Sequence, residues 1–207
     1  MSDIIVPVQK WFRAKAAIAT KLALAAALYT LTGAGAILAG PGTVEPEILN
    51  QAREGDMKRL IVHDQPREVH EVEITDASGK SATIGDFSGS VVVLNFWATW
   101  CAPCIKEMPS LDRLQQSFDP ADVVVVAVAT GRNSVAKVEN FLEENDIRSL
   151  MILYDRKTRL SGAMSVISIP VTVLIDRNGA EVARFIGDTT WDSDEAIKVI
   201  KILAETN

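Results

Sequence analysis

Cysteine and histidine are scarce in this sequence, with two of each among 207 residues. A small secreted domain held by a disulfide framework needs several cysteines spread along the chain, whereas Cys101 and Cys104 lie close together. A structural zinc site takes four ligands, and the two histidines, His63 and His70, lie before the expected domain core. Residue 105 is Ile, so the Cys-x-x-Cys-His motif of haem attachment is absent. We therefore predict no metal site and expect both histidines to be ordinary surface or loop residues.

Proline is also sparse, at eight residues, and 48% of the sequence is apolar. Such a chain can bury a core, and widespread disorder is excluded. The formal net charge of −6 conceals an asymmetry, because residues 1–40 contain four basic residues against Asp3. An acidic body after a basic N-terminus argues against nucleic acid as a partner.

Charged residues are missing from residues 22–40, which read LALAAALYTLTGAGAILAG. This run is close to the ~20 apolar residues that a helix needs to cross a bilayer. The basic residues all precede it, which predicts a cytoplasmic segment at residues 1–21, a transmembrane signal anchor at 22–40, and a domain outside the cytoplasm. The alternatives are a cleaved signal peptide, whose apolar region usually spans about 7–15 residues, and a buried soluble helix. The length favours the anchor.

A linker with one short helix is expected over residues 41–66. Apolar residues recur at helical spacing from Glu45 to Val62, and Pro46 is typical of a first helical turn. We place the folded domain at residues 67–207.

Buried strands and amphipathic helices alternate in this domain. The apolar β-branched runs 91–96 and 123–129 are typical of strands buried on both faces. The other expected elements are a hairpin over Glu71–Ile84, helices to about Phe118, over Val135–Glu144 and over Ser193–Ala204, a short strand or loop at 151–154, and a hairpin around Asn178-Gly179. This order predicts an α/β fold with a mixed central sheet flanked by helices.

The string VVVLNFWATWCAPC places a Cys-x-x-Cys motif directly after a buried strand, where a helix begins. Free backbone N–H groups and the helix dipole favour the thiolate of Cys101 there, and a thiolate attacks disulfides. Cys104, one turn further and buried, is placed to resolve the mixed disulfide. Pro103 suits the first helical turn and limits the flexibility of the loop. A buried thiol pair and a copper(I) site are the alternatives.

Residues 67–207 resemble the thioredoxin superfamily and, within it, the TlpA-like branch of membrane-anchored periplasmic thioredoxins. The segment FWATWCAPCIKEMPSL carries this resemblance, since its aromatic residues and dithiol match the active-site signature and Glu107 and Pro109 match the longer extracytoplasmic one. The resemblance implies a thioredoxin-like fold and a thiol:disulfide oxidoreductase with no cofactor besides its dithiol. It also implies a single-pass protein of the bacterial inner membrane with its domain in the periplasm.

Further roles follow from the resemblance. In such proteins a cis-proline faces the dithiol, and Ile169-Pro170 matches that position, where it would bind a substrate backbone. An ordinary trans-proline at a strand start is the alternative. Glu107 would tune the thiols and transfer a proton, unless it is a solvated helix carboxylate. Trp100 and Pro103 would shape the docking surface, and Trp97 would support the loop by packing.

One position departs from cytoplasmic thioredoxins, which carry a buried Asp on the strand before the motif. This chain has Asn95 there, in a supporting position. An amide neither accepts nor releases a proton at ordinary pH. Glu107 or solvent must then transfer the proton.

The direction of electron flow depends on the relative stability of the two redox forms and on the partner. The resemblance implies a reductase that takes electrons from a membrane dithiol donor. The implied clients are copper-centre assembly proteins of cytochrome oxidase, namely a Sco-type chaperone or the copper-binding subunit, with apocytochrome c as the alternative. A copper-carrying module is the rival of another class, although Sco-type carriers use Cys-x-x-x-Cys and a distant His, and no His follows residue 70.

Overall fold

The computed structural model describes residues 44–206. Its strands are β1 (Ile61–Glu68), β2 (Ile74–Thr75), β3 (Ser81–Ala82), β4 (Val91–Trp97), β5 (Val123–Thr130), β6 (Met151–Asp155), β7 (Val171–Ile175) and β8 (Ala180–Ile186). The α-helices are α2 (Pro46–Ala52), α3 (Ala102–Gln116), α4 (Val135–Glu144), α5 (Arg159–Ala163) and α6 (Asp194–Glu205), and two 3₁₀ turns are η2 (Gly55–Arg59) and η3 (Ile84–Phe87).

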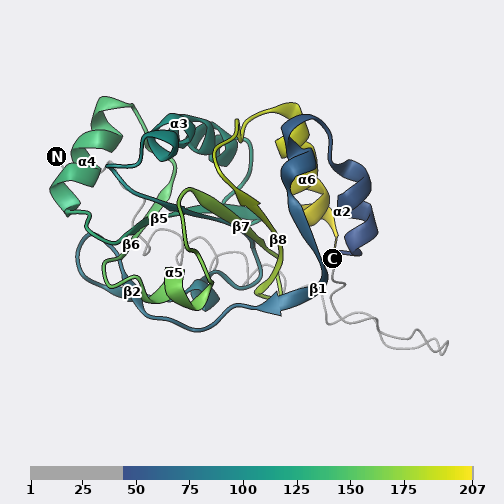
Figure 1. Cartoon of the computed structure of the whole chain (residues 1–207), viewed down its shortest axis with the longest axis horizontal. Coiled ribbons are helices and arrows are strands. Elements are labelled where there is room, and N and C mark those ends of the chain that lie inside the picture. Colours follow the sequence, from purple (N-terminus) through teal and green to yellow (C-terminus); the bar gives the residue numbers. More distant parts are fainter. Residues whose placement is uncertain (1–43, 207) are drawn as a thin grey trace, which may run out of the picture.

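All eight strands form one sheet in the order β1-β8-β7-β4-β5-β6-β2-β3 (Figure 1). Strand β4 pairs in parallel with β5, and β5 in parallel with β6, whereas the remaining pairs are antiparallel. The predicted mixed sheet is therefore confirmed. Both predicted hairpins are present, and residues 151–154, left open between strand and loop, belong to β6.

Two apolar cores lie on opposite faces of the sheet. One is formed with α2, α3, α4 and α6, and the other with η3 and α5. Figure 1 shows α3 and α4 on one side of the sheet and α5 on the other. Every residue of β4 and β5 is buried, because these strands are covered on both faces. The rigid centre of the fold therefore ends where the Cys-x-x-Cys loop begins.

The segment expected to be a linker is structured within residues 44–66. Helix α2 packs against α6, and β1 pairs antiparallel with β8 as an edge strand of the sheet. The predicted domain boundary at residue 67 thus falls inside β1. The strand is mostly exposed and shows no apolar alternation, so its sequence lacks the usual strand signal.

His63 corrects a second expectation, because this residue of β1 is buried and only 6% exposed. Its Nε2 lies 2.6 Å from Oε1 of Glu181 on β8. The Arg184 guanidinium donates to both oxygens of the same carboxylate and to the carbonyl of Met164. Hydrogen bonds from Arg184 and His63 lower the pKa of Glu181 against the opposing effect of burial. The contact between His63 and Glu181 links β1 to β8. His70, by contrast, is exposed, as expected.

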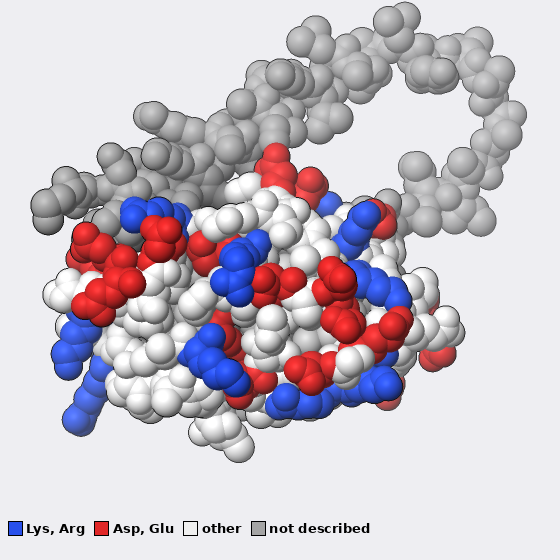
Figure 2. Space-filling view, turned by 90° about the horizontal axis from the view of Figure 1, so that it is seen from above, with Lys and Arg blue, Asp and Glu red and all other residues white. Residues whose placement is uncertain are grey.

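The predicted membrane anchor lies outside the described residues. Between residues 44 and 206, no helix has the length and apolar character needed to cross a bilayer. In the face of the molecule drawn in Figure 2, basic and acidic side chains are interspersed. Ion pairs across the described surface include Arg113 with Asp192 and Lys198 with Glu54.

The packing of α2 gives a test of whether this helix belongs to the domain. Leu49 is fully buried in the core, whereas its neighbour Ile48 is 46% exposed. Leu49→Ala should therefore lower the free energy of unfolding by about 2–5 kcal/mol, because it leaves a cavity. The matched control Ile48→Ala should cost less than about 1 kcal/mol. Urea unfolding measures both, and equal small losses would mean that α2 is a detached linker helix.

Candidate active site

The reactive loop is placed by the end of β4 and the start of α3. Cys101 is the N-cap residue of α3, and its Sγ accepts a hydrogen bond of 3.4 Å from the backbone N–H of Cys104. Pro103 lies in the first turn, where its missing N–H leaves no bond unmade. The N-terminal end of a helix is electropositive and favours negative charge on sulfur. The predicted setting of the Cys101 sulfur at a helix start is therefore confirmed.

The two cysteines form a disulfide, with their Cα atoms 5.2 Å apart. Cys104 is fully buried, whereas Cys101 is 6% exposed and borders a groove. An attacking or departing thiol can therefore reach Cys101 from the groove, while Cys104 is covered.

The groove beside Cys101 has a volume of about 630 Å³. Its walls come from the reactive loop, the end of β5, helix α5 and the segment before β7, and its lining residues are Trp100, Cys101, Pro103, Thr130, Gly131, Thr158, Ser161, Gly162, Val166, Ile167, Ser168 and Ile169. Two large apolar side chains stand out into solvent here, Trp100 at 65% exposure and Ile167 at 99%. An apolar surface of this kind suits a polypeptide partner.

The peptide bond between Ile169 and Pro170 is cis, as predicted. The carbonyl oxygen of Ile169 lies 3.7 Å from Cys101 Sγ. The segment that precedes β7 therefore meets the dithiol directly, although the two are far apart in sequence.

Glu107 lies on α3 one turn after Cys104 and is only 2% exposed, so it is no solvated surface carboxylate. Burial raises its pKa to about 7, against the opposing effect of hydrogen bonds from Asn95, Trp191 and the backbone of Thr189. The Asn95 amide donates to Oε1 at 2.8 Å, and Trp191 Nε1 donates to Oε2 at 3.2 Å. A carboxyl group with this pKa changes its protonation near neutral pH, as a general base must.

The support residues lie behind the dithiol. Asn95 on β4 also donates to Thr172 Oγ1 at 2.9 Å, and its own amide oxygen has no partner among the described residues. Trp97 is fully buried and packs against the Phe141 ring, with ring centroids 5.3 Å apart.

Sequence reasoning missed several residues of this site. Trp191 donates to Glu107, and Thr172 accepts a hydrogen bond from Asn95, which itself contacts Glu107. Asn133 accepts hydrogen bonds from the backbone N–H and the hydroxyl group of Thr99 in the reactive loop. Trp191, a large aromatic residue in the polar segment DTTWDSDE, was the one local signal available. Thr172 and Asn133 have none, because their roles depend on strand pairing and loop position.

No group of three or more potential His, Cys, Asp or Glu ligands comes together between residues 44 and 206. His63 on β1 forms a hydrogen bond with Glu181 on β8. The described site offers the chemistry of a dithiol, with the buried carboxyl group of Glu107 one turn further along α3.

Several known proteins are similar to this chain. The profile of the Redoxin family matches residues 64–200. The thiol-disulfide oxidoreductase ResA of Bacillus cereus is 35% identical over 122 residues, which span 59% of this chain and 69% of the relative. The thioredoxin-like protein YneN of Bacillus subtilis is 32% identical over 123 residues, 59% of this chain and 71% of the relative.

Solved structures of thiol:disulfide interchange proteins and thioredoxins have a similar fold. A putative thiol:disulfide interchange protein DsbE from Chlorobium tepidum is similar with a TM-score of 0.60 and 25% identity, covering 68% of this chain and 98% of that one. The exposed lipoprotein thioredoxin Etrx1 of Streptococcus pneumoniae gives a TM-score of 0.55 at 28% identity, over 64% and 98% of the two chains. The chain therefore belongs to the Redoxin family, and it is a thioredoxin-like thiol:disulfide oxidoreductase whose disulfide joins Cys101 and Cys104.

Proposed function

We propose that this enzyme reduces disulfides of client proteins on the outer side of a bacterial inner membrane. The observation that carries the proposal is the pairing of Cys101, at a helix start beside an open groove, with Glu107, a buried carboxyl group one turn below the dithiol. The TlpA-like signature and the basic, apolar N-terminus support the extracytoplasmic location.

The reaction begins with the reduced dithiol. The Cys101 thiolate attacks one sulfur of the client disulfide, and the other client sulfur leaves as a thiolate that takes up a proton. The Cys104 thiol then gives its proton to the Glu107 carboxylate, directly or through a water molecule, and attacks Cys101 Sγ. The client departs with two thiols, and the enzyme keeps the disulfide. A membrane dithiol donor returns two electrons by the same exchange.

The carboxyl group also bears on the direction of electron flow. A negative charge one turn from the dithiol opposes a second negative charge on sulfur and so disfavours the thiolate. Disfavouring the thiolate disfavours the reduced form, and an enzyme of this kind donates electrons more readily. The negative charge of Glu107 thus opposes the stabilisation of the Cys101 thiolate by the helix dipole. It favours the direction in which the enzyme donates electrons, as a reductase does.

The groove suggests how a client binds. The Ile169 carbonyl oxygen, 3.7 Å from Cys101 Sγ, is available to a backbone N–H of an extended segment. Trp100 and Ile167 border the same groove and would pack on apolar side chains of the client. Copper-centre assembly proteins of cytochrome oxidase are the proposed clients, and apocytochrome c is the second candidate.

Trapping the mixed disulfide tests this function. Cys104→Ser keeps the nucleophile and removes the resolving thiol, so it should accumulate a covalent adduct with the client. Cys101→Ser should form no adduct and lose disulfide-reductase activity. Non-reducing electrophoresis and mass spectrometry of the adduct measure the outcome and identify the client.

Three results would contradict the proposal. Adducts on Cys101→Ser but not on Cys104→Ser would reverse the roles of the two cysteines. Unchanged reduction of a disulfide substrate by both variants would exclude the redox function. Copper retention by the intact protein, lost in both variants, would favour the copper-carrying module instead.

The pH dependence tests Glu107. The carboxyl group, with a pKa of about 7, is protonated below that pH and accepts a proton only above it. The rate at which the wild-type mixed disulfide resolves, divided by the rate for Glu107→Gln, should therefore rise through about pH 7 to about 100-fold. Stopped-flow measurements from about pH 5.5 to 8.5 give this ratio, which removes the shared ionisation of the thiol.

The matched control is Glu143→Gln, which makes the same change at an exposed position of α4. Its ratio should stay near one at every pH. A flat ratio for Glu107→Gln as well would show that solvent, not Glu107, takes the proton.

A further inference from the structure

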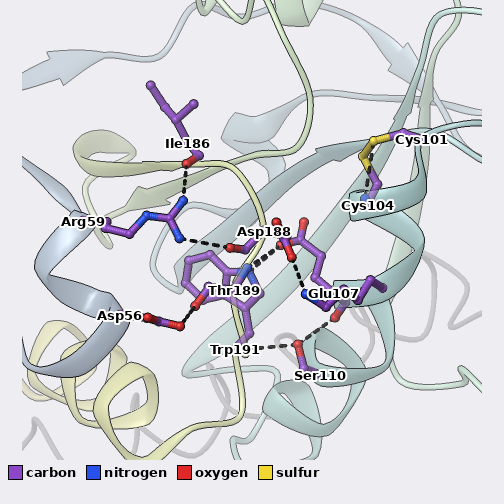
Figure 3. Close-up of polar contacts among 11 residues, drawn as sticks. Asp56, Arg59, Cys101, Cys104, Glu107, Ser110, Ile186, Asp188, Thr189 and Trp191 are labelled. Carbon is purple, nitrogen blue, oxygen red and sulfur yellow. Dashed lines mark hydrogen bonds and ion pairs between the residues drawn. A yellow bond between two sulfur atoms is a disulfide. The ribbon is translucent and has the colours of Figure 1, made fainter.

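The buried carboxyl group of Glu107 is contacted by the loop that joins β8 to α6, residues 187–193 (the β8–α6 loop). Within the described residues, Oε2 is held only from this loop, by the Thr189 backbone N–H at 3.4 Å and by Trp191 Nε1 at 3.2 Å (Figure 3). The Trp191 backbone N–H donates to Ser110 Oγ at 3.0 Å, which fixes the end of the loop on α3. The position of the loop thus decides whether the carboxyl group keeps two of its three donors.

Arg59, the last residue of η2, lies across the start of this loop. Its Nη2 donates to the Ile186 carbonyl oxygen at 3.2 Å, and its Nη1 contacts the Asp188 carbonyl oxygen at 3.4 Å. The guanidinium carbon is 4.7 Å from the centre of the Phe185 ring, within the range of a cation–π contact. Figure 3 shows the guanidinium group pointing from η2 towards Ile186 and Asp188.

Gly187 makes this close approach possible. Its φ is +95°, and a Cβ atom built there would lie 2.9 Å from Arg59 Nη2. The absence of a side chain lets the planar guanidinium group reach two carbonyl oxygens of the turn at once. A lysine ammonium group, which is a point charge, does not offer this forked geometry.

We propose that Arg59 is a positioning residue for Glu107, acting through the β8–α6 loop. It lies in the segment that precedes β1, and it joins that segment to the proton-transferring group of the site. The functional meaning of this inference rests on the proposed role of Glu107. The contacts between Arg59, the loop and Glu107 do not depend on that role. Removing the guanidinium group should loosen the loop and weaken the two hydrogen bonds to Oε2.

Several charged groups surround the carboxyl group and are part of the test. Lys106 on α3 pairs with the Asp188 carboxylate at 2.9 Å, and Asp56 on η2 contacts Thr189 Oγ1 at 3.5 Å. The charge of Asp188 raises the pKa of Glu107, whereas the proposed action of Arg59 is through the loop. The thiols also titrate in the reduced enzyme, so the oxidised form is the one to measure.

The experiment is a carboxyl ¹³C NMR titration of the oxidised full-length chain, with the Glu107 resonance identified by its absence in Glu107→Gln. Arg59→Met keeps the apolar part of the side chain and removes the donors. Its Glu107 midpoint should rise by about half a pH unit or more, because donors to the charged form are lost while burial remains. Lys58→Met, the same change at the neighbouring exposed position, should leave the midpoint unchanged.

A midpoint that is unchanged or lowered in Arg59→Met would overturn the proposal, and so would an equal shift in Lys58→Met. Urea unfolding separates general destabilisation from positioning, because loss of stability alone does not move the midpoint in the folded protein. If the midpoint rises but the reductase assay shows no dependence on Glu107, the positioning contact stands and the proposed catalytic role fails. If reductase activity depends on Glu107 but the Glu107 midpoint is unchanged in Arg59→Met, only the positioning proposal fails.

Discussion

Burial of β4 on both faces of the sheet is the constraint on which the site depends. Because β5 and β7 flank this strand and helices cover both sides of the sheet, its end has one defined position. The chain then has four residues between β4 and α3, and this short connection fixes the start of the helix and the Cys101 sulfur. The dithiol therefore takes its electrostatic setting from the helix and its place in the molecule from the sheet.

The local part of the site was predictable and the distant part was not. The sequence places a buried strand, a Cys-x-x-Cys motif and a helix within a short stretch, so periodicity and motif spacing are enough to find Cys101 and Cys104. The surroundings of Glu107 depend on Trp191, which donates to it from the segment after β8, and on Thr172 of β7, which accepts a hydrogen bond from Asn95. Contacts of that kind leave no periodic pattern. The resemblance to known thioredoxins, not the spacing, predicted Ile169-Pro170.

The sequence pattern also did not predict the strand at the start of the domain, for a different physical reason. An edge strand needs only one hydrogen-bonding neighbour and exposes most of its side chains, so β1 carries no alternation of apolar residues. Its one buried polar residue, His63, is compensated by Glu181 and Arg184 on β8. A buried histidine with a partner looks the same in sequence as an exposed one, and only the pairing of β1 with β8 distinguishes them.

Asn95 on β4 carries no ionisable group, whereas Glu107, whose carboxyl group it contacts, lies on helix α3. On α3, Glu107 is closed on one side by Asn95 and on the other by the β8–α6 loop. That loop is less constrained than a strand, and it is held by Arg59 from a segment before the sheet. Through the proposed action of Arg59, the protonation of Glu107 depends on the part of the fold that precedes β1.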